Sequence, residues 1–204
     1  MYLYPGWVRL WHLLNAVFVV ILILTGISIR YPGDDMKFIF EFPKAVKWHN
    51  TSAILLTVNY IFFVTGNFLT ENGKYYLLRK QNFWSGMGRQ MKYYAYGMFR
   101  GAKDPFPVSF EQKFNPLQKF SYIIVMYVAM PLVIISGMGL LFPGVEVKKL
   151  FGVSIPVITD IFHITMGTLL ALFLLIHIYI CTLGSKSASR FRGIITGFVE
   201  SDED

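Results

Sequence analysis

The stretch HITMGTLLALFLLIH, residues 163–177, decides how the rest of the chain is interpreted. It begins and ends with histidine and has no charged residue in between. It lies inside an apolar run, residues 161–183, that is long enough to cross the roughly 30 Å hydrocarbon core of a bilayer as a helix. Ionisable side chains inside a membrane helix are costly and are usually functional. The stretch therefore indicates a site within the membrane.

Three further runs share this character, at residues 10–29, 48–69 and 120–142, and none of the runs contains Lys, Arg, Asp or Glu. Hydrophobic residues make up 54% of the 204-residue chain and charged residues only 15%. Backbone groups in lipid must be satisfied within their own segment, which favours helices. We therefore expect an all-α membrane protein with a single domain, residues 1–204. It is a four-transmembrane-helix bundle with spans at about 8–30, 46–69, 118–142 and 159–184, followed by a disordered acidic tail at about 198–204.

The connection between the second and third spans contains a helical pattern in residues 83–101. Met87, Met91, Tyr94 and Met98 recur at helical spacing on one face, with basic residues elsewhere. Such an amphipathic helix suits the membrane interface, and docking of a soluble partner is a compatible alternative. We expect an interfacial helix between the second and third spans.

The net charge of +7 is explained by membrane topology without any need for nucleic-acid binding. Thirteen of the 19 basic residues lie before the first span, in the long connection or after the last span. Basic residues gather in cytoplasmic loops, which predicts that both termini and the long connection are cytoplasmic. The single cysteine, Cys181, excludes an internal disulfide, a cysteine-rich metal cluster and a c-type haem attachment motif.

All four histidines, His12, His49, His163 and His177, lie in or at the edges of the spans. His163 and His177 are 14 residues apart, which puts them about 21 Å apart along a helix and within about 40° of the same face, so they serve two centres. Because successive spans run in opposite directions, depth pairs His12 with His177 near the inner surface and His49 with His163 near the outer one. Zinc needs more ligands than these depths offer, whereas haem iron needs only two axial ligands. We therefore expect two b-type haems.

Small and basic residues near the two pairs are candidates for contacts with the cofactors. Three glycines lie at the outer depth, with close helix packing as the alternative. Three basic residues at helix ends are candidates for neutralising haem propionates, with ordinary snorkelling of their side chains as the alternative. These candidates are Gly26, Gly137 and Gly167, and Arg9, Arg30 and Lys47.

The stretches YPGWVRLWHLLNAVFVVILILTG (4–26), KWHN (47–50) and the histidine pair at 163 and 177 give the chain a likeness to a known family. It resembles the di-haem cytochrome b membrane subunits of hydrogenases, formate dehydrogenases and thiosulfate reductase-type enzymes, a bacterial cytochrome b561-like family, over residues 4 to 195. Arg9, His12, Thr25 and Gly26 match the first-span pattern, although Trp11 precedes the histidine instead of following it. The resemblance implies ligand roles for the four histidines, paired as above.

The resemblance also implies a function in the bacterial cytoplasmic membrane. Such a subunit passes electrons between the quinone pool, menaquinone or ubiquinone, and a periplasmic or membrane-anchored redox partner of the iron–sulfur or c-type cytochrome kind. Asn115, Gln118 and Tyr122 are candidates for contacts with quinone near the inner surface. Asn115 precedes a proline and is equally well explained as a helix start.

Two other functions remain open. One is a stand-alone transmembrane oxidoreductase of the quinol- or ferric-reducing type. The other is a small transporter in which the histidines relay protons. The chain contains no nucleotide-binding motif and no glycine-rich phosphate loop. An electron-transfer subunit of a larger oxidoreductase complex is therefore expected, rather than a self-sufficient enzyme.

Overall fold

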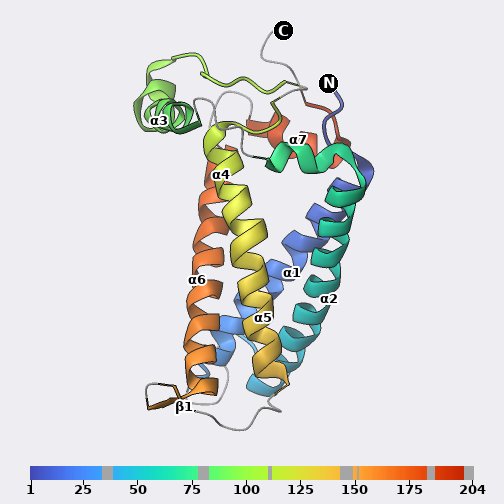
Figure 1. The fold of residues 1–204 in the computed structure, drawn as a ribbon, viewed down its shortest axis with the longest axis vertical. Helices are drawn as coiled ribbons and strands as arrows, with labels where there is room; N and C mark the ends of the chain where they lie inside the picture. Colours follow the sequence, from blue (N-terminus) through green and yellow to red (C-terminus); the bar gives the residue numbers. More distant parts are fainter. Residues whose placement is uncertain are drawn as a thin grey trace. The chain divides into compact units, whose positions relative to one another are not determined.

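Four long apolar helices form the framework of the chain (Figure 1). They are α1, Gly6–Arg30; α2, Phe42–Leu69; a third span, Pro116–Leu141; and α6, Ile155–Thr182. Each is long and apolar enough to cross a membrane, which confirms the predicted all-α membrane fold. The computed structural model describes residues 1–33, 39–77, 83–109, 112–142, 149–150, 152–182 and 187–199.

Two of the spans begin about four residues before the predicted boundary, and each has a proline in its first turn. Pro43 follows Phe42 at the start of α2, and Pro156 follows Ile155 at the start of α6. Proline lacks a backbone N–H. It is tolerated in the first helical turn because the N–H groups there have no acceptor within the helix. The proline that looks like a helix breaker therefore marks the true beginning of these helices.

The third span is not a uniform α-helix. It consists of α4, Pro116–Ile124; a π-helical turn, η4, Val125–Ala129; and α5, Met130–Leu141. Asn115 caps the start of α4: its side chain accepts from the Gln118 N–H at 2.8 Å, and the Gln118 side chain accepts from the Asn115 N–H at 3.2 Å. A π-turn inside a helix is rare and frequently occurs at functional sites.

The connection between α2 and α4 contains two helical segments. A short 3₁₀-helix, η1, Glu71–Tyr76, follows α2 directly. The expected helix begins at Phe83 as α3, Phe83–Lys92, but continues as a π-turn, η2, Tyr93–Gly97, and a 3₁₀-turn, η3, Met98–Arg100. The π-turn shifts the helical register, so the predicted methionine face is not continuous. Gln90 is fully buried instead, and Met91 is 55% exposed.

Two small elements were not predicted. Strands β1, Lys149–Leu150, and β2, Val153–Ser154, pair antiparallel just before α6. Helix α7, Ser187–Thr196, follows α6 and ends at Gly197, whose φ of 89° favours glycine. Phe198, at the start of the predicted tail, pairs with Tyr2 in a β-bridge. Residues 200–204 of that tail lie outside the described part of the chain.

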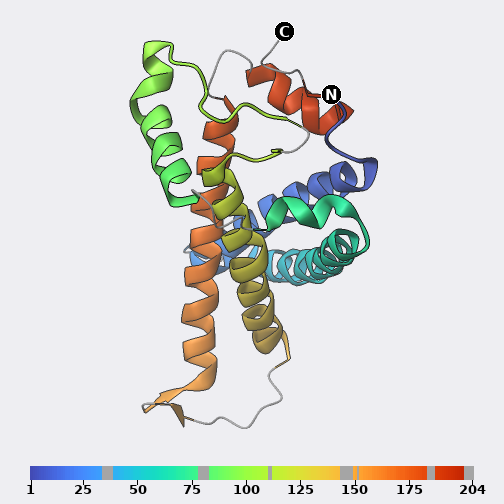
Figure 2. The same ribbon diagram turned by 45° about the horizontal axis from the view of Figure 1, so that its top comes forward.

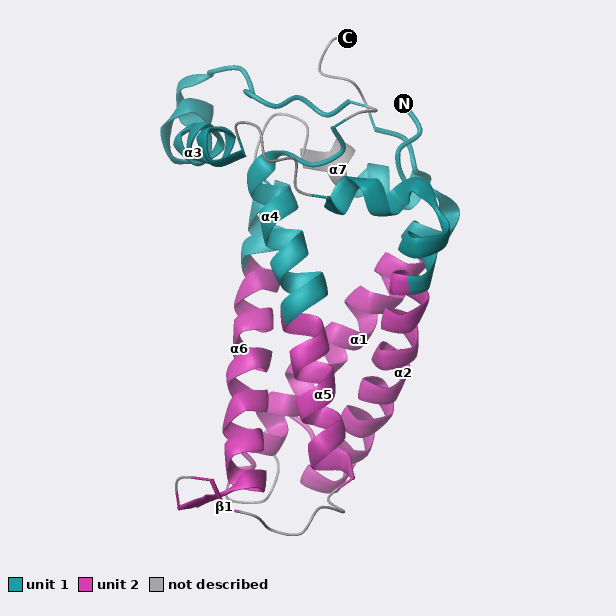
Figure 3. Ribbon diagram, in the orientation of Figure 1, with its two compact units in different colours: residues 1–9, 65–128, 176–204 teal, residues 10–64, 129–175 magenta. Residues whose placement is uncertain are grey.

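The chain forms two compact units that interleave along the sequence (Figure 3). Unit 1 comprises residues 1–9, 65–128 and 176–204, and unit 2 comprises residues 10–64 and 129–175. Unit 2 contains most of α1, α2, α5 and α6, and α5 and α6 lie side by side in it (Figures 1 and 2). His12, His49 and His163 belong to unit 2, and His177 belongs to unit 1.

Candidate functional site

The two histidines predicted to form the outer pair lie close together in unit 2. His49 is in the first half of α2, and His163 is in the first half of α6. Their ring centroids are 6.3 Å apart, and the ring planes are inclined by 76°. The fold therefore brings two imidazole rings from residues 114 positions apart in the sequence next to each other.

The hydroxyl of Thr25 in α1 determines the protonation of His49. Its Oγ1 lies 3.0 Å from His49 Nδ1 and donates its own proton to the Ile21 carbonyl at 2.7 Å. The oxygen must then accept from the ring, so Nδ1 carries the proton. A neutral imidazole protonated at Nδ1 has its lone pair at Nε2, the nitrogen that remains for a metal ion.

The hydroxyl of Ser136 in α5 determines the protonation of His163 in the same way. Its Oγ lies 3.0 Å from His163 Nδ1 and donates to the Leu132 carbonyl at 2.8 Å. The side chains of Thr25 and Ser136 are both buried, so water does not compete for these bonds. Two unrelated helices therefore fix the two imidazoles in the same tautomer, with both Nε2 lone pairs available as ligands.

A glycine follows each of these hydroxyl residues and faces the same ring. A Cβ atom added at Gly26 would lie 3.5 Å from His49 Cε1, and one added at Gly137 would lie 3.0 Å from His163 Cε1. The second contact is tighter than nearly all real Cβ contacts, so the ring occupies the space that a side chain would need. A Cβ at Gly167 would meet no atom within 4 Å, so its cofactor contact stays a prediction.

A b-type haem fits this donor set. The described residues contain no group of three or more His, Cys, Asp or Glu side chains that could hold a metal ion. Two imidazoles with available Nε2 atoms match the two axial positions of haem iron, because the porphyrin supplies the other four ligands. Glycines beside both rings let the two imidazoles pack closely against α1 and α5.

The two histidines predicted to form the inner pair belong to different units, so their pairing stays a prediction. In unit 2, His12 follows Trp11, whose buried ring stacks on Phe63 with centroids 4.2 Å apart. The Trp11 Nε1 and the Asn15 side-chain oxygen are buried and have no hydrogen-bond partner among the described residues. In unit 1, the His177 ring lies 6.1 Å from the ring of Tyr122.

The three basic candidates differ in their surroundings. Arg9 in unit 1 donates to the Ile195 carbonyl, which ties the start of α1 to α7. Arg30 and Lys47 are exposed, and the Arg30 guanidinium lies 6.0 Å from the ring of Tyr31. Exposure of these two side chains suits ordinary snorkelling at helix ends as well as contact with a propionate.

Two of the three quinone candidates are engaged in local structure. Asn115 and Gln118 form the reciprocal cap of α4, and Asn115 also donates to the Tyr94 hydroxyl at 3.0 Å. Tyr122 packs against Phe114, with ring centroids 4.9 Å apart, and against His177. The helix-start explanation for Asn115 is thus supported by its contacts, and the contact with quinone stays a prediction.

Comparison with known proteins shows the family. Residues 3–197 match the family described as prokaryotic cytochrome b561. The chain belongs to the prokaryotic cytochrome b561 family. A relative in Escherichia coli K12, named "Putative cytochrome YdhU", is 30% identical over 197 residues, which cover 97% of this chain and 74% of the relative. No solved structure matches the chain. Membership confirms the resemblance seen in the sequence.

As a prokaryotic cytochrome b561, the protein is a multi-pass membrane protein that binds b-type haem and transfers electrons. This favours the haem interpretation of the intramembrane histidines over a proton-relay transporter. Sequence reasoning named Thr25 in the first-span pattern of this cytochrome b561 but missed the role of its hydroxyl, and it missed Ser136 altogether. The available signal was that each directly precedes a glycine in a span, in the dipeptides TG and SG.

Proposed function

We propose that this cytochrome b561 carries two b-type haems and passes electrons across the membrane between a periplasmic redox partner and the quinone pool. His49 and His163 would hold the outer haem, and His12 and His177 the inner one. The observation that carries the proposal is the outer site, where two imidazoles converge with their Nδ1 protons held by hydroxyls. Bound there, haem supplies an iron that gains and loses one electron.

Helix α6 supports a second centre. It extends without interruption from Ile155 to Thr182 and carries both His163 and His177. Fourteen residues correspond to a rise of about 21 Å, too far for both to ligate one iron. The unpartnered polar atoms of Trp11 and Asn15 near His12 also favour a bound group there, because buried polar atoms in proteins are almost always hydrogen-bonded.

The residues around the outer site have distinct tasks in this proposal. The two imidazoles bind the iron and orient the macrocycle. Thr25 and Ser136 each hold a proton at Nδ1, which keeps the ligand nitrogen unprotonated at every turnover. Gly26 and Gly137 leave the space that the two imidazole rings occupy. The charge bias of the loops supports a cytoplasmic position for the long connection, and therefore for quinone exchange.

Haem stoichiometry of the purified protein tests the proposal. The pyridine haemochrome assay is expected to give two haems per chain, with a b-type α band in the reduced-minus-oxidised spectrum. His163→Ala and His177→Ala are each expected to lose one haem while staying monodisperse in detergent. The two-haem assignment is wrong if the wild type binds one haem. The pairing is wrong if either monodisperse variant loses both haems or neither.

A further inference from the structure

A line of hydrogen-bonded side chains in unit 1 leads from the segment before α4 into the third span. The Lys113 ammonium donates to Asn72 Oδ1 at 3.1 Å, Asn72 Nδ2 donates to Asn67 Oδ1 at 2.6 Å, and Asn67 Nδ2 donates to the Tyr127 hydroxyl at 3.2 Å. We call Lys113, Asn72, Asn67 and Tyr127 the amide chain. Every donor in it points the same way, from a positive charge at one end toward a phenol at the other.

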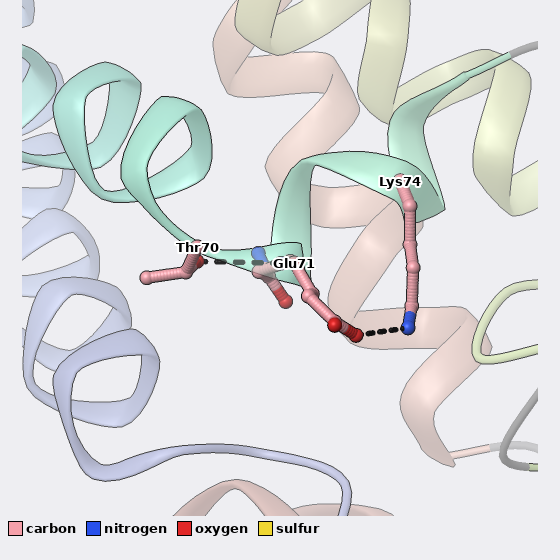
Figure 4. Close-up of polar contacts among 4 residues, drawn as sticks. Thr70, Glu71 and Lys74 are labelled. Atoms are coloured by element: carbon pink, nitrogen blue, oxygen red, sulfur yellow. Dashed lines mark hydrogen bonds and ion pairs between the residues drawn. The ribbon is translucent and has the colours of Figure 1, made fainter.

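The local fold sets the position of Asn72 in the amide chain. Thr70 caps η1 by accepting from the Asn72 N–H at 3.3 Å, and Lys74 pairs with Glu71 at 2.6 Å across the same turn (Figure 4). The cap helps to hold the backbone of η1 in the geometry that directs the Asn72 amide toward Asn67. The side chains of Asn67 and Asn72 are buried.

Lys113 retains a buried positive charge without a carboxylate. It is 3% exposed and forms no ion pair with any residue in the described part of the chain. The titratable groups that face its amine are the phenols of Tyr4 and Tyr75, whose ring centroids lie 4.5 and 5.3 Å away. Burial lowers the pKa of Lys113 to about 8. Burying a charge without a carboxylate partner costs free energy, which suggests that Lys113 has a functional role.

Tyr127 lies at the other end of the amide chain, in the π-turn η4 of the third span. The residue is 39% exposed, so part of its side chain can be reached by a molecule arriving from the membrane. Because its oxygen accepts from Asn67, its own O–H serves as a donor. Hydrogen bonds in series polarise one another, so the Lys113 charge makes this phenol a stronger donor.

A line of aromatic rings connects Tyr127 with the predicted inner haem ligand. Tyr76 contacts both Tyr127 and Phe114, with ring centroids 5.7 Å apart in each case. Phe114 contacts Tyr122 at 4.9 Å, and Tyr122 contacts His177 at 6.1 Å. The donor at the end of the amide chain and His177 therefore belong to one packed cluster in unit 1.

We propose that the Tyr127 hydroxyl donates a hydrogen bond to a carbonyl oxygen of the quinone head group, and that Lys113 is a positioning residue that strengthens this donor through the amide chain. The inference rests on the proposed function, which supplies the quinone. Quinone carbonyls only accept hydrogen bonds and the quinone ring is apolar, so a polarised phenol among aromatic rings matches both properties. This proposal adds Tyr127 to the predicted quinone contacts of Asn115 and Gln118, which stay predictions.

Oxidation of the haems by quinone tests the inference in the intact protein. Pre-reduced protein is mixed in a stopped-flow instrument with decylubiquinone or menadione, and the quinone concentration that gives half the maximal rate is measured. Tyr127→Phe, which keeps the ring, is expected to raise this concentration about tenfold, the cost of one good hydrogen bond. Oxidation by ferricyanide, haem content and visible spectrum are expected to stay unchanged. Tyr179→Phe, at an exposed tyrosine of α6, is the matched control.

The pH dependence of the half-saturating quinone concentration is a second readout. A lysine with a purely structural role would not affect it. Lys113→Arg stays charged at all accessible pH values, and Lys113→Met is never charged. The wild type loses its charge as pH rises through about 8. Its half-saturating quinone concentration is therefore expected to rise above pH 8, whereas K113R stays low and K113M stays about threefold high throughout.

The outcomes separate the two proposals. Unchanged half-saturation in Y127F, or the same pH profile in K113R and wild type, overturns the amide-chain inference and leaves the proposed function in place. Haems that neither quinone oxidises in the wild type overturn the quinone link itself. If K113M fails to fold, K113R and Y127F still decide the question, because K113R keeps the positive charge and Y127F keeps the ring.

Discussion

A hydroxyl group beside each outer imidazole decides which ring nitrogen carries the proton. Thr25 and Ser136 donate their own protons to backbone carbonyls, so each can only accept from Nδ1. Hydrogen bonds of this kind orient metal ligands and make them more basic, and losing one typically costs about 10–100-fold in metal affinity. The same logic applies to an iron held by His49 and His163.

Replacing Thr25 with valine keeps the shape of the side chain and removes the acceptor. We expect Thr25→Val to weaken haem binding at the outer site by about 10–100-fold and to raise the midpoint potential of that haem, since a less basic ligand stabilises the oxidised iron less. Haem titration and a spectroscopic redox titration measure the two effects. Thr25→Ser keeps the hydroxyl and is the control, and a T25V protein with wild-type affinity and potential would contradict the tautomer assignment.

Gly137 and Gly139 lie on the same helix and differ in what a methyl group would meet. A Cβ at Gly137 would lie 3.0 Å from His163 Cε1, whereas one at Gly139 would lie 3.6 Å from Thr159 Cγ2, an ordinary contact. We expect Gly137→Ala to displace the imidazole and lower haem affinity about tenfold, with an overpacking cost of about 1–3 kcal/mol. Gly139→Ala is expected to change thermal stability and haem content little. Equal haem loss in both variants would argue against the close approach at Gly137.

The histidines were recognisable in the sequence, and their hydroxyl partners were not. His12, His49, His163 and His177 stand out because imidazoles in apolar runs are rare. Thr25 matched the first-span pattern, but its contact with His49, 24 positions away, is visible only in the structure. Lys113 looked like one more cytoplasmic lysine, and its burial depends on contacts with Asn72 and Tyr4 that are remote in sequence.

At the level of the elements, α6 acts as a spacer between two predicted centres. Adding one residue to an α-helix rotates all later residues by about 100° and moves them by about 1.5 Å. An alanine inserted after Leu169, between the two histidines, is expected to reduce the haem content from two to about one per chain. The substitution Leu169→Ala, at an exposed position, is the control for the local change. An insertion protein that keeps two haems would show that α6 does not set the register.

Apolar composition predicted the spans well but not their internal irregularities. The four runs without charges correspond to α1, α2, the third span and α6, because burying a charge in lipid costs more than any local preference. The π-turn at Val125–Ala129 was not predictable, since its residues are equally compatible with a regular α-helix. It depends on tertiary contacts such as the bond from Asn67 to Tyr127.

For the molecule as a whole, the basic residues predict one orientation in the membrane. With 13 of the 19 basic residues in the termini and the long connection, these segments are expected on the cytoplasmic side. Green fluorescent protein fused to the C-terminus should fluoresce, and alkaline phosphatase fused after Gly33 should be active. Fluorescence lost at the C-terminus together with an inactive Gly33 fusion would invert the topology and place quinone exchange on the opposite side.

The outer site is assembled from two helical hairpins that are made at different times. Helices α1 and α2 contribute Thr25 and His49, and helices α5 and α6 contribute Ser136 and His163. The ribosome completes the first hairpin, with one imidazole already in its working tautomer, before the second exists. Ligation of haem iron by both histidines at this site must therefore wait until α6 has been synthesised and inserted. We expect products truncated before α6 to lack the visible absorbance of the outer haem, which would distinguish them from protein that contains α6.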